Sequence, residues 1–256
     1  MQAPASHDEI TAFLDRYKPF ANSLEEEYIT VNLHHDDAGG AGSCIRVEDK
    51  LNDEVFLTEK DEVKRLLNEG VAWVNTKVPL KDRQRRRREV YATFEEEAKQ
   101  LAKRHGVVGG KWLYFAKQQT NSIWTQLVLA AAFEGEPLAE TGAVTEVKVT
   151  SKRNNKSSHA FSICCRDSWD KDAVAKVLDA LVVDLGIFPA AYKPDIYSAL
   201  DIYSNGPTGT RSSLYKPLDL MDRAKLENAV LMWRTEREDY AARVAQEQEA
   251  EQRKGK

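Results

Sequence analysis

The sequence predicts an α+β protein in which one curved, mostly antiparallel sheet is backed by helices on one face, plus a long C-terminal helix. Three observations lead to this prediction. Several short segments alternate apolar and polar residues with a period of two, as half-buried strands do. Others repeat apolar residues three and four positions apart, as amphipathic helices do. The 256 residues, 42% of them hydrophobic, can bury one sizeable core.

The first 78 residues are predicted to form helices and two strands. Residues 8–20 suggest a short helix, and 28–34 (YITVNLH) alternate as a strand does. In 58–69, Thr58 is placed to cap a helix whose inner side carries Val63, Leu66 and Leu67. Gly70 is expected to end that helix, and GVAWVNTKV after it is a candidate strand.

The central part is predicted to contain a long helix and most of the sheet. Good helix formers run from Lys81 to a stop at Gly106. Strands are expected near 111–116, 143–150, 159–166 and 190–203, with a helix around 121–133. A further helix at 170–185 has the clearest apolar stripe, formed by Val174, Val177, Leu178, Leu181, Val182 and Leu185.

The C-terminal segment, 222–256, holds eight acidic and eight basic residues, with apolar residues only in its first half. We expect a helix docked at its start through Leu226, Val230, Leu231 and Trp233, and frayed at its end. The expected organisation is therefore an acidic N-terminal extension over 1–69, an α+β domain over 70–217 and a charged C-terminal helix over 218–256.

Composition narrows the class of protein. No apolar run approaches the roughly 20 residues of a membrane span, and the start lacks the features of a signal peptide. We expect a cytoplasmic protein, with a nuclear location as a second option. Cys44, Cys164 and Cys165 do not suggest a disulfide framework. Because His34 and His35 are adjacent and no CxxC occurs, we expect no metal or other cofactor.

Charge is sorted by segment rather than spread evenly. Residues 24–62 hold twelve acids and three bases, whereas 81–88 (KDRQRRRR) hold six bases and one acid. The run RQRRRR could be a nuclear localisation signal or a nucleic-acid patch. The three glutamates at 95–97 favour the alternative, a solvated helix face whose charge they compensate.

Residues 192–215 (YKPDIYSALDIYSNGPTGTRSSLY) are unusually rich in tyrosine. Tyrosine rings can stack on bases, lysine and arginine bind phosphate, and the NGPTG turn lets backbone approach a ligand. The alternative is structural, with Asp195 pairing with Lys193 or accepting from a tyrosine hydroxyl. The candidate ligand-binding residues in this stretch are Lys193, Tyr197, Tyr203, Asn205 and Arg211.

Motifs of catalysis are missing. Ser212 and Ser213 have no partner arrangement for nucleophilic catalysis, and GVVGGK lacks the spacing of a phosphate loop. We therefore expect no enzymatic activity. An enzyme acting on nucleotides stays open only if Asp195, Asp201 and His159 converge in space.

Four segments in order resemble the mRNA cap-binding initiation factor, the 4E class: GGKWLYFAKQ, IWTQLVLAAAFEGE, GAVTEVKV and LVVDLGIFP. The chain is more similar to the family named after the basophilic leukaemia-expressed protein, whose fold resembles the 4E class. YKPDIY, IYSN and SLY look like that family's own signature. The resemblance covers about residues 70–217.

The resemblance implies roles for several residues. Trp112 and Trp124 match tryptophans that serve the fold, and Lys148 falls where the cap-binding class has an arginine near the nucleotide phosphates. The loop residues Lys152, Arg153 and Lys156 resemble further phosphate-contacting bases. The cap binders also hold methylated guanine between two tryptophans, but EEEAKQLAKRHGVV contains no aromatic residue, so Trp73 would be the remaining stacking candidate.

These observations favour a monomeric, non-catalytic binding module for a nucleotide or an RNA 5′ end, held through the basic loop rather than by a two-tryptophan sandwich. The alternative is a protein-interaction scaffold that uses the helical face or the C-terminal helix and has no nucleotide ligand. Clustered bases favour the first function, and exposed apolar side chains on a helix favour the second.

Overall fold

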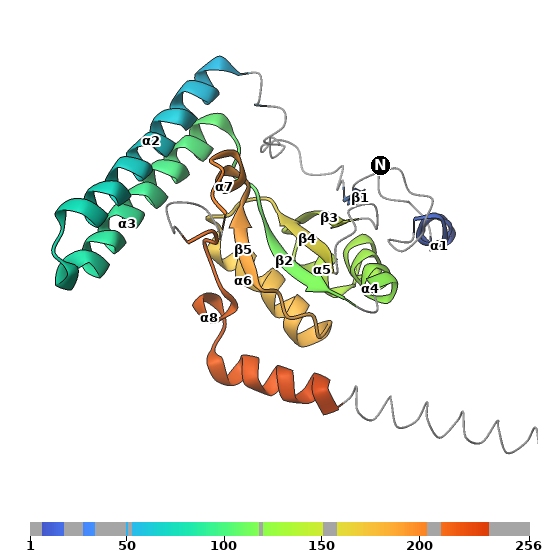
Figure 1. The fold of residues 1–256 in the computed structure, drawn as a ribbon. Helices are drawn as coiled ribbons and strands as arrows, with labels where there is room; N and C mark the ends of the chain where they lie inside the picture. The colour runs from blue at the N-terminus through green and yellow to red at the C-terminus, as the bar shows by residue number, and fades with distance from the viewer. Residues whose placement is uncertain are drawn as a thin grey trace, which may run out of the picture.

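The computed structural model describes residues 7–17, 28–33, 50, 53–117, 120–150, 158–203 and 211–235. Within these residues one antiparallel sheet of five strands has the order β1-β3-β4-β2-β5. The strands are β1 (Tyr28–Asn32), β2 (Gly110–Ala116), β3 (Val144–Thr150), β4 (His159–Cys165) and β5 (Ala191–Pro194). The predicted α+β class is confirmed (Figure 1).

One face of the sheet is covered by helices, and the main core lies between them. These elements are α1 (His7–Arg16), α4 (Thr120–Ala132), α5 (Pro137–Glu140), α6 (Lys171–Asp179) and a π-helical turn η3 (Ala180–Asp184). Helix α8 (Pro217–Leu220) packs against α6, and a helical segment over 223–235 packs against η3. The indole Nε1 of Trp112 donates to the carbonyl oxygen of Val174 at 3.2 Å and so ties β2 to α6. The apolar stripe predicted over 170–185 is buried as expected.

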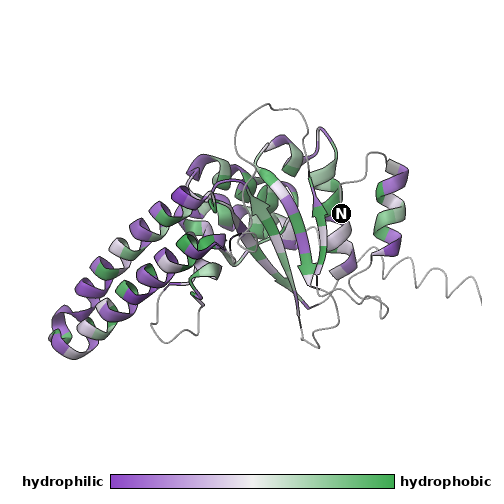
Figure 2. Ribbon diagram, turned by 90° about the horizontal axis from the view of Figure 1, so that it is seen from above, coloured by the Kyte–Doolittle hydropathy of each residue, from purple (hydrophilic) through white to green (hydrophobic). Residues whose placement is uncertain are grey.

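A second core joins two long antiparallel helices to the segment after β5. The helices are α2 (Glu54–Lys77) and α3 (Leu80–His105), and the segment begins with α7 (Asp195–Ala199). Phe56, Leu67 and Phe94 of the helices are buried in one cluster with Ile196 and Tyr197. The hairpin of α2 and α3 projects away from the sheet, so its turn is far from the rest of the molecule (Figures 1 and 2).

The strand predicted over 71–78 is wrong, because α2 continues through these residues to Lys77. Val71, Val74 and Val78 are buried and extend the inner stripe of α2. Gly70 does not end the helix: a Cβ there would lie 2.8 Å from Cγ1 of Val90, so glycine lets α2 and α3 approach closely.

The N-terminal cap predicted at Thr58 is also wrong. The helix begins one turn earlier, where the Asp53 side chain accepts a hydrogen bond from the backbone N–H of Phe56 at 3.1 Å. The Thr58 hydroxyl lies inside the helix and donates to the carbonyl oxygen of Glu54 at 2.8 Å. The capping pattern at Thr58 therefore predicted the start of the helix about one turn too late.

Two predictions near the C-terminus need correction. The strand predicted over 190–203 ends at Pro194, and the chain turns into α7 so that Ile196 and Tyr197 enter the second core. In 223–235, the side chains of Val230 and Leu231 are 47% and 65% exposed, whereas Trp233 donates to the carbonyl oxygen of Val183 at 3.1 Å. Of the four residues predicted to dock this helix, Leu226 and Trp233 therefore do so, whereas Val230 and Leu231 face solvent. Residues 236–256 lie outside the described residues.

In the part of the chain that the structure describes, no helix combines the length and the apolar character needed to cross a membrane.

Candidate functional site

The sheet has a polar face, defined here as the face opposite the one that packs against α4 and α6. Alternate residues of a strand point to opposite faces, so Lys111, Leu113 and Phe115 lie on the side opposite to the buried Trp112. The strand registers extend these positions across the sheet. The polar face therefore consists of the strand residues that alternate with the buried core residues along each strand.

Three rows of residues cross the polar face. The row nearest α7 contains Asn32, Glu146, Cys164, Lys111 and Lys193. The next row contains Thr30, Lys148, Ser162, Leu113 and Ala191. The third contains Tyr28, Thr150, Ala160 and Phe115.

Two lysines lie side by side in the first row. Lys111 is the register partner of Lys193, and its Nζ lies 3.0 Å from Oδ1 of Asp195. Lys193 is 7% exposed, and its Nζ lies 4.0 Å from the ring centroid of Tyr203. Burial lowers the pKa of Lys193 to about 8, and repulsion from Lys111 adds to the effect. The carboxylates of Asp195 and Asp201 oppose this decrease only in part, and each is paired with another lysine, Lys111 or Lys64.

The third lysine of the polar face, Lys148, lies in the second row. Its Nζ is 2.7 Å from Oε2 of Glu146, which is 8% exposed. Cys164, between Glu146 and Lys111 in the first row, is a buried free thiol whose pKa is raised by burial. The thiol is therefore held in its protonated form and is not a reactive nucleophile.

Aromatic rings occupy both ends of the third row. Tyr28 is 49% exposed and Phe115 is 53% exposed. The two residues between them, Thr150 and Ala160, have small side chains, and the backbone N–H of Ala160 donates to Oγ1 of Thr150 at 2.9 Å. Exposed rings on a sheet can stack on nucleic-acid bases, and amines can bind phosphate. The polar face combines both groups.

Of the residues predicted from the sequence to bind a ligand, Lys148, Lys193 and Tyr203 lie at the polar face. Tyr197 does not: it is 1% exposed, its ring packs 5.6 Å from that of Phe94, and burial raises the pKa of its hydroxyl. The ring is needed by the second core because α7 has no other large aromatic side chain to fill that space. Tyr197 cannot stack on a base.

Trp73 and Arg211 also lie elsewhere. Trp73 is on α2, 49% exposed, and the strand that was to carry it to the sheet does not exist. Arg211 forms an ion pair with Asp219 at the start of α8. The remaining predicted residues, Lys152, Arg153, Lys156 and Asn205, lie outside the described residues.

The three residues named for an enzymatic function do not converge. His159 is 5% exposed at the end of β4 that pairs with Ala116, whereas Asp195 follows β5 at the end that pairs with Gly110. Asp195 is paired with Lys111, and Asp201 lies 2.7 Å from Nζ of Lys64 on α2. Asp195 therefore pairs with a different lysine from the one that the sequence suggested.

Sequence reasoning missed Lys111, Phe115 and Tyr28. A signal was present, because in KWLYFA the residues that alternate with the buried Trp112 include both Lys111 and Phe115. What the alternation could not supply was the register, which places Lys111 beside Lys193 and Tyr28 in the same row as Phe115.

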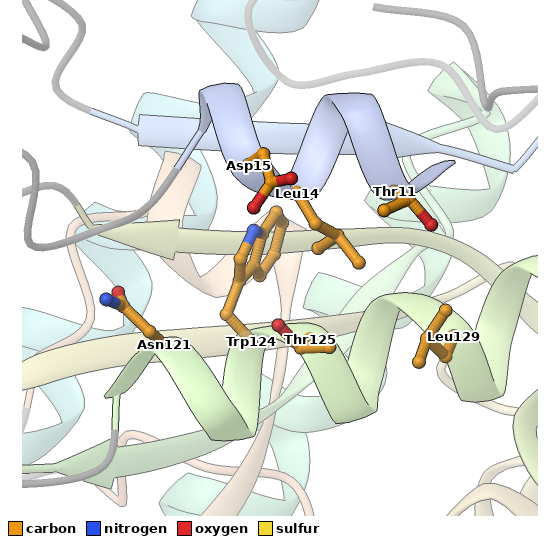
Figure 3. Close-up of a pocket in the computed structure, with 7 residues that line it drawn as sticks. All are labelled: Thr11, Leu14, Asp15, Asn121, Trp124, Thr125 and Leu129. Atoms are coloured by element: carbon orange, nitrogen blue, oxygen red, sulfur yellow. The ribbon is translucent and has the colours of Figure 1, made fainter. Parts of the chain in front are cut away.

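A separate pocket of about 240 Å³ lies on the helical side, between α1 and α4 (Figure 3). Trp124 rises from α4 toward α1 (Figure 3) and is 1% exposed. Among the described residues, its indole Nε1 has no hydrogen-bond partner. The pocket is lined by Thr11, Leu14, Asp15, Asn121, Trp124, Thr125 and Leu129.

Comparison with known proteins identifies the family. The model of the family described as basophilic leukemia-expressed protein Bles03 matches residues 1–204. The chain therefore belongs to this family. A search of curated proteins finds no match for the chain.

Proposed function

We propose that the protein is a non-catalytic binding module that holds a nucleotide or an RNA 5′ end on the polar face of its sheet. The observation that carries this proposal is the placement of Lys111, Lys148 and Lys193 in two adjacent rows of one face. Two of them already have carboxylate partners, but Lys193 is buried with its pKa lowered. A phosphate would add negative charge beside Lys193, whose carboxylate neighbours Asp195 and Asp201 are paired with Lys111 and Lys64.

The aromatic row gives the same face a means of holding a base. Tyr28 and Phe115 are each about half exposed, and a nucleotide bound at the lysines would have its base within the next rows of the sheet. The resemblance to the 4E class supports the proposal because Lys148 matches the basic position near the phosphates there. A sandwich of two tryptophans is no part of the proposal, since Trp73 lies on α2.

Calorimetric titration tests the proposal with GTP, ATP, a methylated-cap dinucleotide and a 5′-phosphorylated RNA trinucleotide at two salt concentrations. We expect binding that weakens with salt and that falls roughly tenfold in Lys111→Ala or Lys148→Ala. Lys176→Ala, which removes an exposed charge from α6 on the other side of the sheet, is the control. Absence of binding by all four ligands at millimolar concentration would contradict the proposal.

A second candidate function, a protein-interaction scaffold, is favoured by one observation. Val230, Leu231 and Met232 are all exposed on the helix over 223–235, with Leu231 at 65%. A photo-crosslinking side chain placed at residue 231 should capture a protein partner in cells. The same side chain at Glu96, an exposed polar position of α3, is the control and should capture less.

A further inference from the structure

The α2–α3 hairpin carries its charge in two opposite blocks. At its base, residues 53–70 hold six acids and three bases. At its tip, residues 75–90 hold seven bases and two acids, a net charge of +5 on a chain whose net charge is −4. Solvated helices that need no ligand usually mix the two signs along their length. The hairpin instead concentrates positive charge where it is farthest from the sheet (Figure 1).

The basic residues of the tip are only partly neutralised. Arg85 and Arg86 pair with Asp82 and Glu89, at distances between 2.7 and 3.7 Å. Arg88 forms no ion pair within the part of the chain that the structure describes, and Arg87 donates to the side-chain oxygen of Asn75 at 2.6 Å. The three glutamates at 95–97, which the sequence offered as compensation, supply none of these partners. Positive charge therefore remains available at the tip.

The geometry of the tip points to a polyanion rather than to a membrane surface. A helix that lies on a membrane needs a continuous apolar face opposite its basic face. On α3, Val90 and Phe94 are turned toward α2, and Phe94 is 4% exposed. Leu80, at the start of α3, is 79% exposed, but it is a single apolar side chain among basic ones and does not form a continuous face. The end of the hairpin is mostly hydrophilic in Figure 2. Basic side chains on several sides suit a phosphate backbone.

We propose that the tip of the α2–α3 hairpin binds the phosphate backbone of RNA at a distance from the polar face. Trp73 supports RNA over other polyanions, because its ring is 49% exposed one helical turn before Lys77 and can stack on a base. The proposal takes its ligand class from the proposed function and adds a second contact. Short ligands would use the polar face alone, and longer RNA would use both.

The test compares a 20-nucleotide single-stranded RNA with a 5′ phosphate to GTP, using fluorescence anisotropy for the RNA and calorimetry for GTP. The tip variant is Arg85→Ala/Arg86→Ala/Arg88→Ala, all at exposed positions. The control, Lys99→Ala/Lys103→Ala/Arg104→Ala, removes the same charge from the base of α3. The tip variant should weaken RNA binding about tenfold and lower the slope of log affinity against log salt by about two; the control should change both less.

The outcomes separate the two proposals. If the 20-nucleotide RNA binds through the tip while none of GTP, ATP, the cap dinucleotide and the RNA trinucleotide binds, the proposed function of the polar face fails and the inference about the hairpin stands. If the RNA binds equally well to the tip variant and the wild type, the inference is overturned. It is also overturned if vesicles containing anionic lipid bind through the tip and RNA does not, or if the tip variant changes only the nuclear fraction of the protein.

Discussion

Lys193 lies directly opposite Lys111 in the register of β5 and β2, so two amines occupy neighbouring positions on the polar face. Asp195 pairs with Lys111 at 3.0 Å, and Lys193 packs over the ring of Tyr203. Asp201 also acts on Lys193, but it is paired with Lys64, so these groups only partly offset two positive charges, one of them buried. Holding the two amines close together destabilises the free protein, and an anionic ligand would reduce this unfavourable energy.

The first prediction concerns the pH dependence of phosphate binding. Because the pKa of Lys193 is lowered to about 8 and a bound phosphate favours its charged form, affinity should fall as the pH rises through 8. Titration with GTP at pH 7 and pH 9 checks this. Lys193→Arg keeps its charge over this range and should lose the pH dependence. Equal pH dependence in both proteins would show that Lys193 does not contact the phosphate.

The same group makes a prediction about stability in the absence of ligand. Its folded pKa, about 8, lies below the ordinary value of 10.5, so the unfolded chain binds more protons between these values. The free energy of unfolding should therefore rise by about 1–3 kcal/mol as the pH increases from 8 to 10.5. Below pH 8 Lys193 is protonated in both the folded and the unfolded state, so it adds no pH dependence to this free energy. Urea unfolding of the wild type and of Lys193→Met measures the difference. The variant should lack this rise, and an identical slope in the two proteins would contradict the prediction.

The sheet and α3 were largely predictable from the sequence, whereas the second half of α2 and the polar face were not. The alternation in KWLYFA and GAVTEVKV marked β2 and β3 because one face of each is buried. The segment GVAWVNTKV is rich in valine, which predicts a strand. Yet Val63, Leu67, Val71, Val74 and Val78 are spaced by three or four, which is a helical stripe. The valine content and Gly70, a residue type that often ends a helix, both favour a strand here, although the spacing of the apolar residues is helical.

The candidate site was found only in part for a related reason. Lys148 came from a family resemblance, and Lys193 from the tyrosine-rich stretch, so each was identified alone. Their common face depends on which strands are neighbours and in which register, and no local pattern encodes that. Tyr197 is the converse case. Its residue type suggests stacking on a base, but α7 directs its ring into the second core.

A further prediction separates the exposed rings from the buried one. Phe115→Ala should lower the affinity for RNA by about 1–3 kcal/mol if the ring stacks on a base, with little loss of stability because the ring is 53% exposed. Tyr197→Ala should instead cost roughly 3–5 kcal/mol of stability, as for other large buried rings. Binding assays and urea unfolding of both variants check the pair. Unchanged RNA affinity in Phe115→Ala would remove the third row from the site.

The last prediction tests the packing that holds β2 in the position where Lys111 meets Lys193. A Cβ at Gly110 would lie 2.4 Å from Oγ of Ser168 and 2.8 Å from the hydroxyl oxygen of Tyr192. Both groups are buried, and Oγ of Ser168 donates to the carbonyl oxygen of Gly109 at 2.8 Å, so neither can move freely. Gly110→Ala should therefore destabilise the fold by about 1–3 kcal/mol.

Gly135→Ala is the matched control for this substitution. A Cβ at Gly135 meets nothing within 4 Å, but its φ of +84° makes alanine strained, which costs roughly 1 kcal/mol. Thermal unfolding should place Gly110→Ala below Gly135→Ala by a few degrees, since each kcal/mol shifts Tm by roughly 2–4 °C in a chain of this size. Because the clash pushes on β2 and the strain does not, only Gly110→Ala should also weaken GTP binding. Equal losses of stability in the two variants would mean that Ser168 and Tyr192 adapt without moving the strand.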